Sequence, residues 1–196
     1  LSATIVTAIR EDEDGVVWIG TRGGGLNRWE QGRVTSYTSR EGLFDDNVFQ
    51  ILDDGLGRLW MSSNKGVFRV NKNELNAVAR GELTRVDSVA YGQADGMKNS
   101  ECNGWSQPAG ARTSDGRLWF PTVAGVATVD PHALAYNPVR PPVRIEEVVV
   151  DGAKRSLTEE LVLAPGTEKI EVAYTALSLR MPERVAFRYQ LEGLDS

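Results

Sequence analysis

The sequence predicts an all-β protein, a partial β-propeller of three blades followed by a partial immunoglobulin-like β-sandwich. Trp18, Trp60 and Trp119 recur 42 and 59 residues apart. A period near 42 residues, with one tryptophan strand per unit, is typical of propeller blades. After a proline-rich segment at 137–142 the pattern changes to alternating strands, which favours a sandwich. In all three repeats an acidic turn with glycine precedes the tryptophan strand, in residues 11–21, 52–63 and 113–122.

The first blade extends to about residue 42. Gln31-Gly32 separates its last two strands and supplies the positive φ that a tight hairpin needs. Gly23-Gly24-Gly25 predicts a second turn, and Glu41-Gly42-Leu43 crosses to the next blade. The four expected strands are residues 5–10, 16–21, 26–30 and 33–38.

The second blade repeats this order with an insertion before its last strand. Residues 73–81 predict a short helix, capped by Asn71 or Asn73, with Leu75 on its apolar face and Gly81 at its end. This insertion accounts for the longer second tryptophan spacing. Asp95-Gly96-Met97 then mirrors the first crossover. The four expected strands are residues 48–52, 59–62, 67–70 and 86–91.

The third blade is the last of a partial propeller domain that we place at residues 1–136. Known propellers have roughly four to eight blades, so three blades cannot close a ring. We therefore expect exposed blade edges near residues 1–10 and 99–130, covered by another chain or by sequence of the parent protein. Residues 137–142 contain three prolines and predict a stiff, extended linker. The second domain, 143–196, begins with a strand over 143–150 and a hairpin turn at Asp151-Gly152. Further alternation predicts a half-buried antiparallel sheet with its rings in the core, at Ile170, Val172 and Tyr174 and at Val185, Phe187, Tyr189 and Leu191.

Composition narrows the classes of function. The 196 residues are 41% hydrophobic, which supports a packed core. A net charge of −5 and a pI near 5.1 argue against nucleic-acid binding, which needs a basic face. No apolar stretch reaches the length of a membrane span, and no secretory signal opens the chain. The first residues already lie inside a repeat, so we interpret the chain as a fragment of a longer protein.

The repeats resemble the two-component-regulator propeller repeats, whose pattern is D-x-x-G-x-[LV]-W-[IF]-G-T, a turn, and G-[LV]-x-R. The third repeat departs from the pattern with Pro121 in place of glycine and Thr128 in place of arginine. Residues 141–196 resemble the first half of a YYY domain, through the lines around Tyr174 and Tyr189. The matching positions are Asp12, Gly15, Trp18, Gly20, Thr21, Gly25, Leu26 and Arg28, then Asp54, Gly57, Trp60, Gly66, Val67 and Arg69, then Asp115, Gly116, Trp119, Thr122, Gly125 and Val126.

The resemblance implies a periplasmic or otherwise extracytoplasmic sensor region of a two-component histidine kinase, anchored in the inner membrane by segments outside this chain. It implies an unknown small-molecule or oligosaccharide ligand or a partner protein, a homodimer formed through the YYY region, and a signal passed to the membrane. A diguanylate cyclase is an alternative output. Two other classes stay open: a propeller lyase and a structural interaction module.

The candidate binding residues are Arg22, Trp29, Asn64, Lys65 and Trp105. In a propeller blade, the loop between the second and third strands shares a face with the crossover to the next blade. This rule places Arg22 and Asn64-Lys65 together with the crossover 45–47, and such loops concentrate binding residues. Trp29 and Trp105 lie outside the repeat and can serve a surface, whereas Trp18, Trp60 and Trp119 are expected in the core.

We expect no catalytic residue, metal site or cofactor. The acidic turns lack the spacing of a calcium loop, and aspartate before glycine suits a hairpin turn. His132 and Cys102 are single and have no partner for nucleophilic or metal chemistry. Gly23-Gly24-Gly25 leads into a strand and no Lys-Ser/Thr follows, which favours a turn over a phosphate loop.

Overall fold

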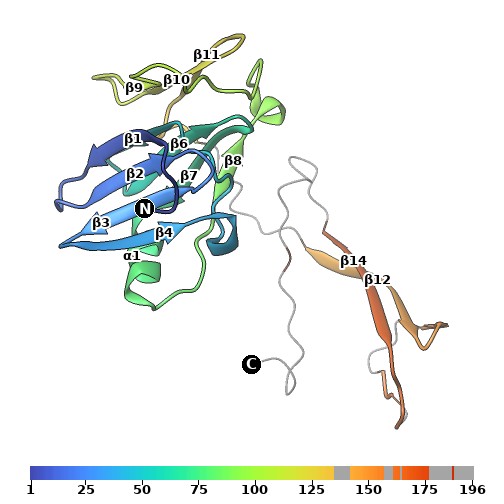
Figure 1. Cartoon of the computed structure of the whole chain (residues 1–196). Coiled ribbons are helices and arrows are strands. Elements are labelled where there is room, and N and C mark those ends of the chain that lie inside the picture. Colours follow the sequence, from blue (N-terminus) through green and yellow to red (C-terminus); the bar gives the residue numbers. More distant parts are fainter. Residues whose placement is uncertain (135–141, 157–160, 164, 177–186, 188–196) are drawn as a thin grey trace. The chain divides into compact units, whose positions relative to one another are not determined.

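The computed structural model describes residues 1–134, 142–156, 161–163, 165–176 and 187. Its strands form four antiparallel sheets with few helical turns, which confirms the all-β fold class (Figure 1). The chain divides into two compact units, Leu1–Leu134 and Ala135–Ser196. Most of the predicted proline-rich linker lies outside the described residues. No helix among the described residues combines the length and the apolar character that a bilayer crossing requires.

The first sheet has the order β1-β2-β3-β4 and forms the first blade. Gln31 and Gly32 have φ values of 48° and 82° and form the predicted hairpin turn between the last two strands. The predicted bounds of all four strands agree with the observed bounds to within one residue. The strands are β1 (Val6–Glu11), β2 (Val17–Thr21), β3 (Leu26–Glu30) and β4 (Arg33–Tyr37).

The second sheet, β5-β6-β7-β8, repeats this meander and adds the predicted helix. Asn71 caps the helix by accepting the Asn73 N–H, and Gly81 ends it with a φ of 77°. The predicted starts at Val48 and Val86 are wrong by two and three residues. The N–H groups of these two residues bond to first-blade carbonyls instead of a neighbouring strand. The elements are β5 (Gln50–Asp53), β6 (Arg58–Ser63), β7 (Gly66–Asn71), α1 (Lys72–Arg80) and β8 (Val89–Tyr91).

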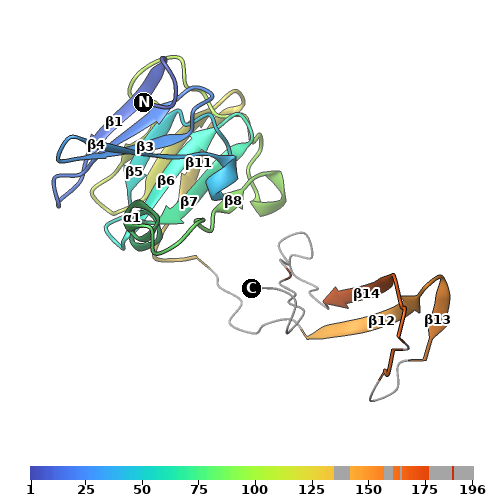
Figure 2. The ribbon, with the colours of Figure 1, turned by 60° about the horizontal axis from the view of Figure 1, so that its bottom comes forward.

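The third sheet contains β9 (Ala111–Arg112), β10 (Leu118–Thr122) and β11 (Gly125–Val129), in the order β11-β10-β9. Figure 2 shows the three sheets following one another in chain order within this unit. Short helical turns, η1 (Ser39–Glu41) and η2 (Gln93–Asp95), form the two crossovers, each ended by a glycine with φ above 90°. The predicted correspondence of the two crossovers is confirmed.

The acidic turn and the tryptophan of each repeat are joined by a side-chain hydrogen bond. A residue in the turn accepts the indole N–H of the tryptophan six positions later, while the same turn satisfies local backbone N–H groups. This explains why an oxygen-bearing side chain stands at that spacing. The three bonds run from Trp18 to Asp12 (2.7 Å), from Trp60 to Asp54 (3.0 Å) and from Trp119 to Thr113 (3.1 Å).

The arginine of the repeat lies over the tryptophan ring. The guanidinium carbon of Arg28 is 5.9 Å from the centre of the Trp18 ring, and that of Arg69 is 5.8 Å from the centre of the Trp60 ring. Both distances are within the range of a cation–π contact. The register places Thr128 opposite Trp119, so the third repeat lacks this contact because its sequence lacks the arginine.

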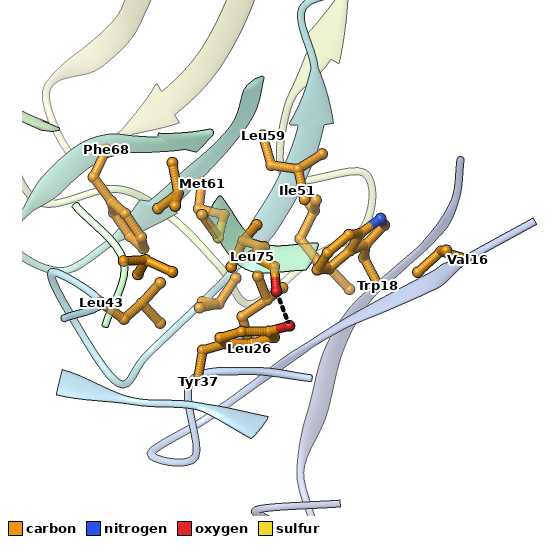
Figure 3. Close-up of a cluster of buried hydrophobic side chains, with 14 residues drawn as sticks. Val16, Trp18, Leu26, Tyr37, Leu43, Ile51, Leu59, Met61, Phe68 and Leu75 are labelled. Atoms are coloured by element: carbon orange, nitrogen blue, oxygen red, sulfur yellow. Dashed lines mark hydrogen bonds between the residues drawn. The ribbon is translucent and has the colours of Figure 1, made fainter. Parts of the chain in front are cut away.

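Two hydrophobic clusters hold neighbouring sheets together. The first lies between the first two sheets and includes Trp18, Tyr37 and Phe68, all fully buried (Figure 3). The helix α1 contributes Leu75, whose carbonyl accepts a 2.7 Å hydrogen bond from the Tyr37 hydroxyl. The second cluster joins the second and third sheets through Phe49, Leu52, Trp60, Val67, Cys102, Leu118 and Phe120.

The prediction that all three repeat tryptophans are core residues is wrong for Trp119, which is only half-buried. Each buried tryptophan packs against the sheet that follows it, and within the described part of this unit no sheet follows the third. Both outer sheets of this unit expose apolar side chains in the ranges where the sequence predicts exposed edges: Ile9 is 70% exposed and Val126 is 59% exposed.

Lys72 and Asp53 form a largely buried ion pair in the second blade, and Glu13 of the first blade joins it. The Lys72 ammonium lies 2.9 Å from Asp53 Oδ2 and 3.3 Å from Glu13 Oε1. Burial pulls the pKa of Asp53 upward, but the Gly55 N–H and Lys72 outweigh it, so the pKa lies below its usual value. Burial likewise lowers the pKa of Lys72, yet its two carboxylate partners raise it overall.

We expect Asp53→Asn to lower the free energy of unfolding at pH 7 by about 1–3 kcal/mol, because it leaves a largely buried ammonium with only Glu13. A depressed carboxylate pKa stabilises the fold above the unfolded value of about 4, and this stabilisation is lost as the pH falls through the folded value. The difference between variant and wild type should therefore shrink in acid. Urea denaturation from pH 7 to pH 3 measures it. Glu13→Gln, at a site 82% exposed, is the control and should change stability by less than about 1 kcal/mol.

The second unit contains a three-stranded sheet in the order β13-β12-β14, formed by β12 (Val143–Val150), β13 (Ala153–Arg155) and β14 (Ile170–Ala176). Asp151 and Gly152 have φ values of 49° and 80° and make the predicted hairpin turn. The Tyr174 ring meets Phe187 edge-on, with 4.8 Å between the ring centres.

The burial predicted for this second sheet is observed only in part, since Val148 and Val150 of β12 are buried, at 8% and 4% exposed. Ile170, Val172 and Tyr174 are 46%, 43% and 38% exposed, because no second layer covers them among the described residues. Apart from Phe187, the strand predicted around Tyr189 lies outside the described residues. The YYY identity of the second domain stays a prediction.

Candidate functional site

Four of the five candidate binding residues lie on loops that contact one another or the first crossover. They are Arg22, Asn64, Lys65 and Trp105. Arg22 pairs with Asn47 of the first crossover in an isolated β-bridge. The Lys65 ammonium lies 3.7 Å from Asp45 of the same crossover. The loop face is defined here as Arg22, Asp45, Asn47, Asn64, Lys65 and Trp105.

Arg22 and Trp105 form the centre of the loop face. The guanidinium carbon of Arg22 lies 4.0 Å from the centre of the Trp105 ring, although the two residues are far apart in the sequence. The Arg22 N–H donates to the Ile5 carbonyl at 3.0 Å, which fixes the backbone from which the side chain extends. The indole-bearing residue is nevertheless 82% exposed, so one aromatic surface remains open to solvent.

The position of Trp105 follows from the close packing of its neighbour, Gly104. A Cβ atom on Gly104 would lie 2.3 Å from the ring of Phe49, which belongs to the second hydrophobic cluster. Only glycine allows the backbone to approach this ring so closely. The buried core therefore anchors the loop immediately before the exposed indole.

The acidic residues of the first crossover have their own partners. Asp45, 4% exposed, accepts the backbone N–H of Asn47 at 3.0 Å and its side-chain amide at 3.2 Å through Oδ1. Its second oxygen, Oδ2, has no hydrogen-bond donor among the described residues and faces the Lys65 ammonium. Asp46 accepts the Ser39 N–H at 2.6 Å. Asn64 is exposed in the turn beside Lys65.

Trp29 lies elsewhere. It is 41% exposed on β3, between Val17 and Val34 of the neighbouring strands. Since Arg28 lies over Trp18 and side chains alternate along a strand, Trp29 belongs to the face of the first sheet that points away from the second. Sequence reasoning grouped Trp29 with the other candidates only because both Trp29 and Trp105 fall outside the repeat.

A groove of about 570 Å³ between α1 and the outer strands β3 and β4 is lined by several positively charged side chains. Two of its arginines already have partners: Arg28 bonds to Glu30 at 3.0 Å and to Asn76 at 2.9 Å. Arg80 forms a fork with Glu82, at 2.6 and 2.8 Å. The charge of this groove is therefore largely neutralised.

Cys102 and His132, the single cysteine and the single histidine of the sequence, are not among the residues of the loop face as defined above. Cys102 is 3% exposed, and burial raises the pKa of its thiol to about 11, so it is protonated near neutral pH. His132 is exposed in a loop. Within the described part of the chain, no three His, Cys, Asp or Glu side chains gather closely enough to hold a metal ion.

Comparison with known proteins agrees with the repeat geometry. Residues 1–23 match the family described as "Two component regulator propeller", and they include the turn and tryptophan strand of the first blade. This match covers one propeller repeat, at the start of the chain. The sequence prediction of this repeat is therefore confirmed.

Similar proteins extend the comparison over more of the chain. Histidine kinase P4 of Formosa agariphila is 26% identical over 140 residues, which is 68% of this chain and 9% of that protein. The extracellular domain assigned to the hybrid two component system BT3049 of B. thetaiotaomicron has a TM-score of 0.58, at 16% identity over 90% of this chain and 24% of its own.

A second solved structure is the extracellular domain assigned to the hybrid two component system BT4673 of B. thetaiotaomicron. It has a TM-score of 0.55, at 22% identity over 67% of this chain and 18% of its own. Both structures share the fold of the propeller-repeat chain. The chain spans a quarter or less of each of these three proteins.

Proposed function

We propose that this chain is part of the extracytoplasmic sensor region of a two-component histidine kinase, in which the propeller engages a ligand or partner. Three findings support the proposal: the propeller repeat at residues 1–23, the similarity to a histidine kinase, and the fold shared with two extracellular domains of two-component systems. The observation that carries it furthest is the propeller repeat, because the description of the matched family itself names two-component regulators.

The loop face is the proposed site of engagement. Its residues come from two turns and two crossovers, all anchored on packed strands, and binding residues concentrate on loops of this kind. An exposed indole beside charged side chains suits a polar ligand, an oligosaccharide or a partner protein. The second unit, as a YYY domain, would pass the change in a homodimer toward the membrane.

A diguanylate cyclase remains the alternative output module. The structural interaction module is favoured over a lyase, because a propeller lyase would need acidic and histidine side chains gathered at one site, and the described residues contain no group of three such side chains close enough to hold a metal ion. Thermal-shift screening of small molecules on the complete extracytoplasmic region separates a sensor from a scaffold.

The role of the loop face in signalling is tested with a full-length receptor that carries both Arg22→Ala and Lys65→Ala. We expect induction of a receptor-dependent reporter to fall about tenfold or more, since each lost charge-assisted contact is worth about 1.5–3 kcal/mol. The control, Arg33→Ala with Arg80→Ala, removes the same charge outside the loop face and should leave induction within about twofold, as surface substitutions usually change little. Unchanged induction in the first variant, with normal receptor levels, would remove the loop face from the mechanism.

A further inference from the structure

The Arg22 guanidinium has no anionic partner among the described residues. Its central carbon lies 4.0 Å from the centre of the Trp105 ring, and its N–H groups form a planar fork of donors around that carbon. No described residue accepts a hydrogen bond from these groups or forms an ion pair with them. This contrasts with Arg28, Arg58 and Arg80 of the same unit, each of which is paired with a carboxylate.

The nearby carboxylates are committed to other groups. Asp45 accepts from Asn47 and faces Lys65, and Asp46 accepts from Ser39. The crossover therefore supplies acidic side chains close to Arg22 in the fold without neutralising it. A planar fork of donors that keeps its charge is suited to a bidentate carboxylate.

The exposed indole supplies the second half of a site. One side of Trp105 meets Arg22 and most of the residue's surface is open, so a flat or ring-shaped body can lie on it. We propose that Arg22 and Trp105 form a subsite for a small organic carboxylate with a ring, its carboxylate paired with Arg22 and its ring packed on Trp105. This rests on the proposed sensor function and names the chemistry of the ligand.

Benzoate and its neutral isostere benzamide are the probes. They are titrated into the whole chain while the Trp105 indole N–H resonance, assigned with Trp105→Phe, is followed by NMR. We expect a saturable shift with benzoate and affinity about tenfold weaker for benzamide, the value of one charge-assisted hydrogen bond. Equal affinities, or no saturable shift with benzoate, would overturn the proposal.

Substitutions of Arg22 test whether the benzoate carboxylate binds to this residue. Arg22→Gln should weaken benzoate binding about tenfold and leave benzamide binding almost unchanged. Arg22→Lys keeps the charge but not the fork, and should fall between wild type and Arg22→Gln. Arg33→Gln removes an exposed charge outside the loop face and should bind benzoate like the wild type. Benzoate affinity that is unchanged in Arg22→Gln, with the other tryptophan resonances intact, would contradict the assignment.

Failure of the sensor function and failure of the carboxylate subsite give different results in these experiments. If the signalling variant loses induction but benzoate and benzamide bind alike, the loop face is a sensor site for another chemistry and only the carboxylate assignment is wrong. If benzoate binds as expected and signalling is unchanged, the subsite exists but is not where the receptor is triggered.

Discussion

Trp60→Ala is expected to lower the free energy of unfolding by about 3–5 kcal/mol, as large-to-small changes of buried aromatic residues do. The side chain is fully buried between the second and third sheets. It also donates to Asp54, stacks on Tyr91 at a ring distance of 5.2 Å and lies under Arg69. Removing the ring leaves a cavity and takes a hydrogen-bond donor from a carboxylate that is 1% exposed.

Trp29→Ala is the matched control, with the same change of residue on a face that no described sheet covers. The residue is 41% exposed and lies between Val17 and Val34, so we expect a loss of less than about 2 kcal/mol. Chemical denaturation followed by far-UV circular dichroism measures both variants. Equal shifts of the two midpoints would show that the repeat tryptophan has no special place in the core.

Gly25→Ala is expected to cost about 2–5 kcal/mol, from left-handed strain of about 1–2 kcal/mol and a steric clash of about 1–3 kcal/mol. Gly25 has a φ of 72°, and a Cβ there would lie 2.0 Å from the Tyr37 carbonyl oxygen. The corresponding Gly66 of the second blade would meet the Tyr91 carbonyl at 2.3 Å in the same way. The position therefore requires glycine for space as well as for conformation.

Gly23→Ala separates these two causes. Gly23 belongs to the same turn and has a φ of 80°, but no atom lies within 4 Å of the point that a Cβ would occupy. This variant should show the strain alone, about 1–2 kcal/mol. Thermal and urea unfolding of both variants give the comparison. A loss at Gly23 as large as that at Gly25 would exclude the clash as the main cause.

The sequence predicted most of the first two blades because their local signals agree. Gln31-Gly32 marks a turn, alternating residues mark strands, and Asn71 with Gly81 brackets α1. The starts of β5 and β8 were misplaced because Val48 and Val86 are strand-like residues whose N–H groups bond to another blade. Such long-range hydrogen bonds leave no local trace. The burial of Trp119 was also misjudged, since it depends on a packing partner rather than on the repeat.

The candidate site was only partly accessible to sequence reasoning. The shared face of turns and crossovers follows from propeller topology, so Arg22, Asn64 and Lys65 could be grouped in advance. The contact between Arg22 and Trp105 could not be predicted, because the two residues are distant in the sequence and belong to different blade connections. Gly104 marks a close backbone approach, but to Phe49, so it gave no signal of the contact with Arg22.

The central claim is that the loop face lies outside the cytoplasm, and thiol labelling tests it most directly. The full-length receptor carries Asn64→Cys, at an exposed turn of the loop face, and spheroplasts are treated with a membrane-impermeant maleimide. The native Cys102 supplies little background, because it is buried and its thiol pKa is raised to about 11. We predict labelling of Asn64→Cys in sealed spheroplasts and none of the wild-type Cys102. Labelling of Asn64→Cys only after lysis would contradict an extracytoplasmic sensor.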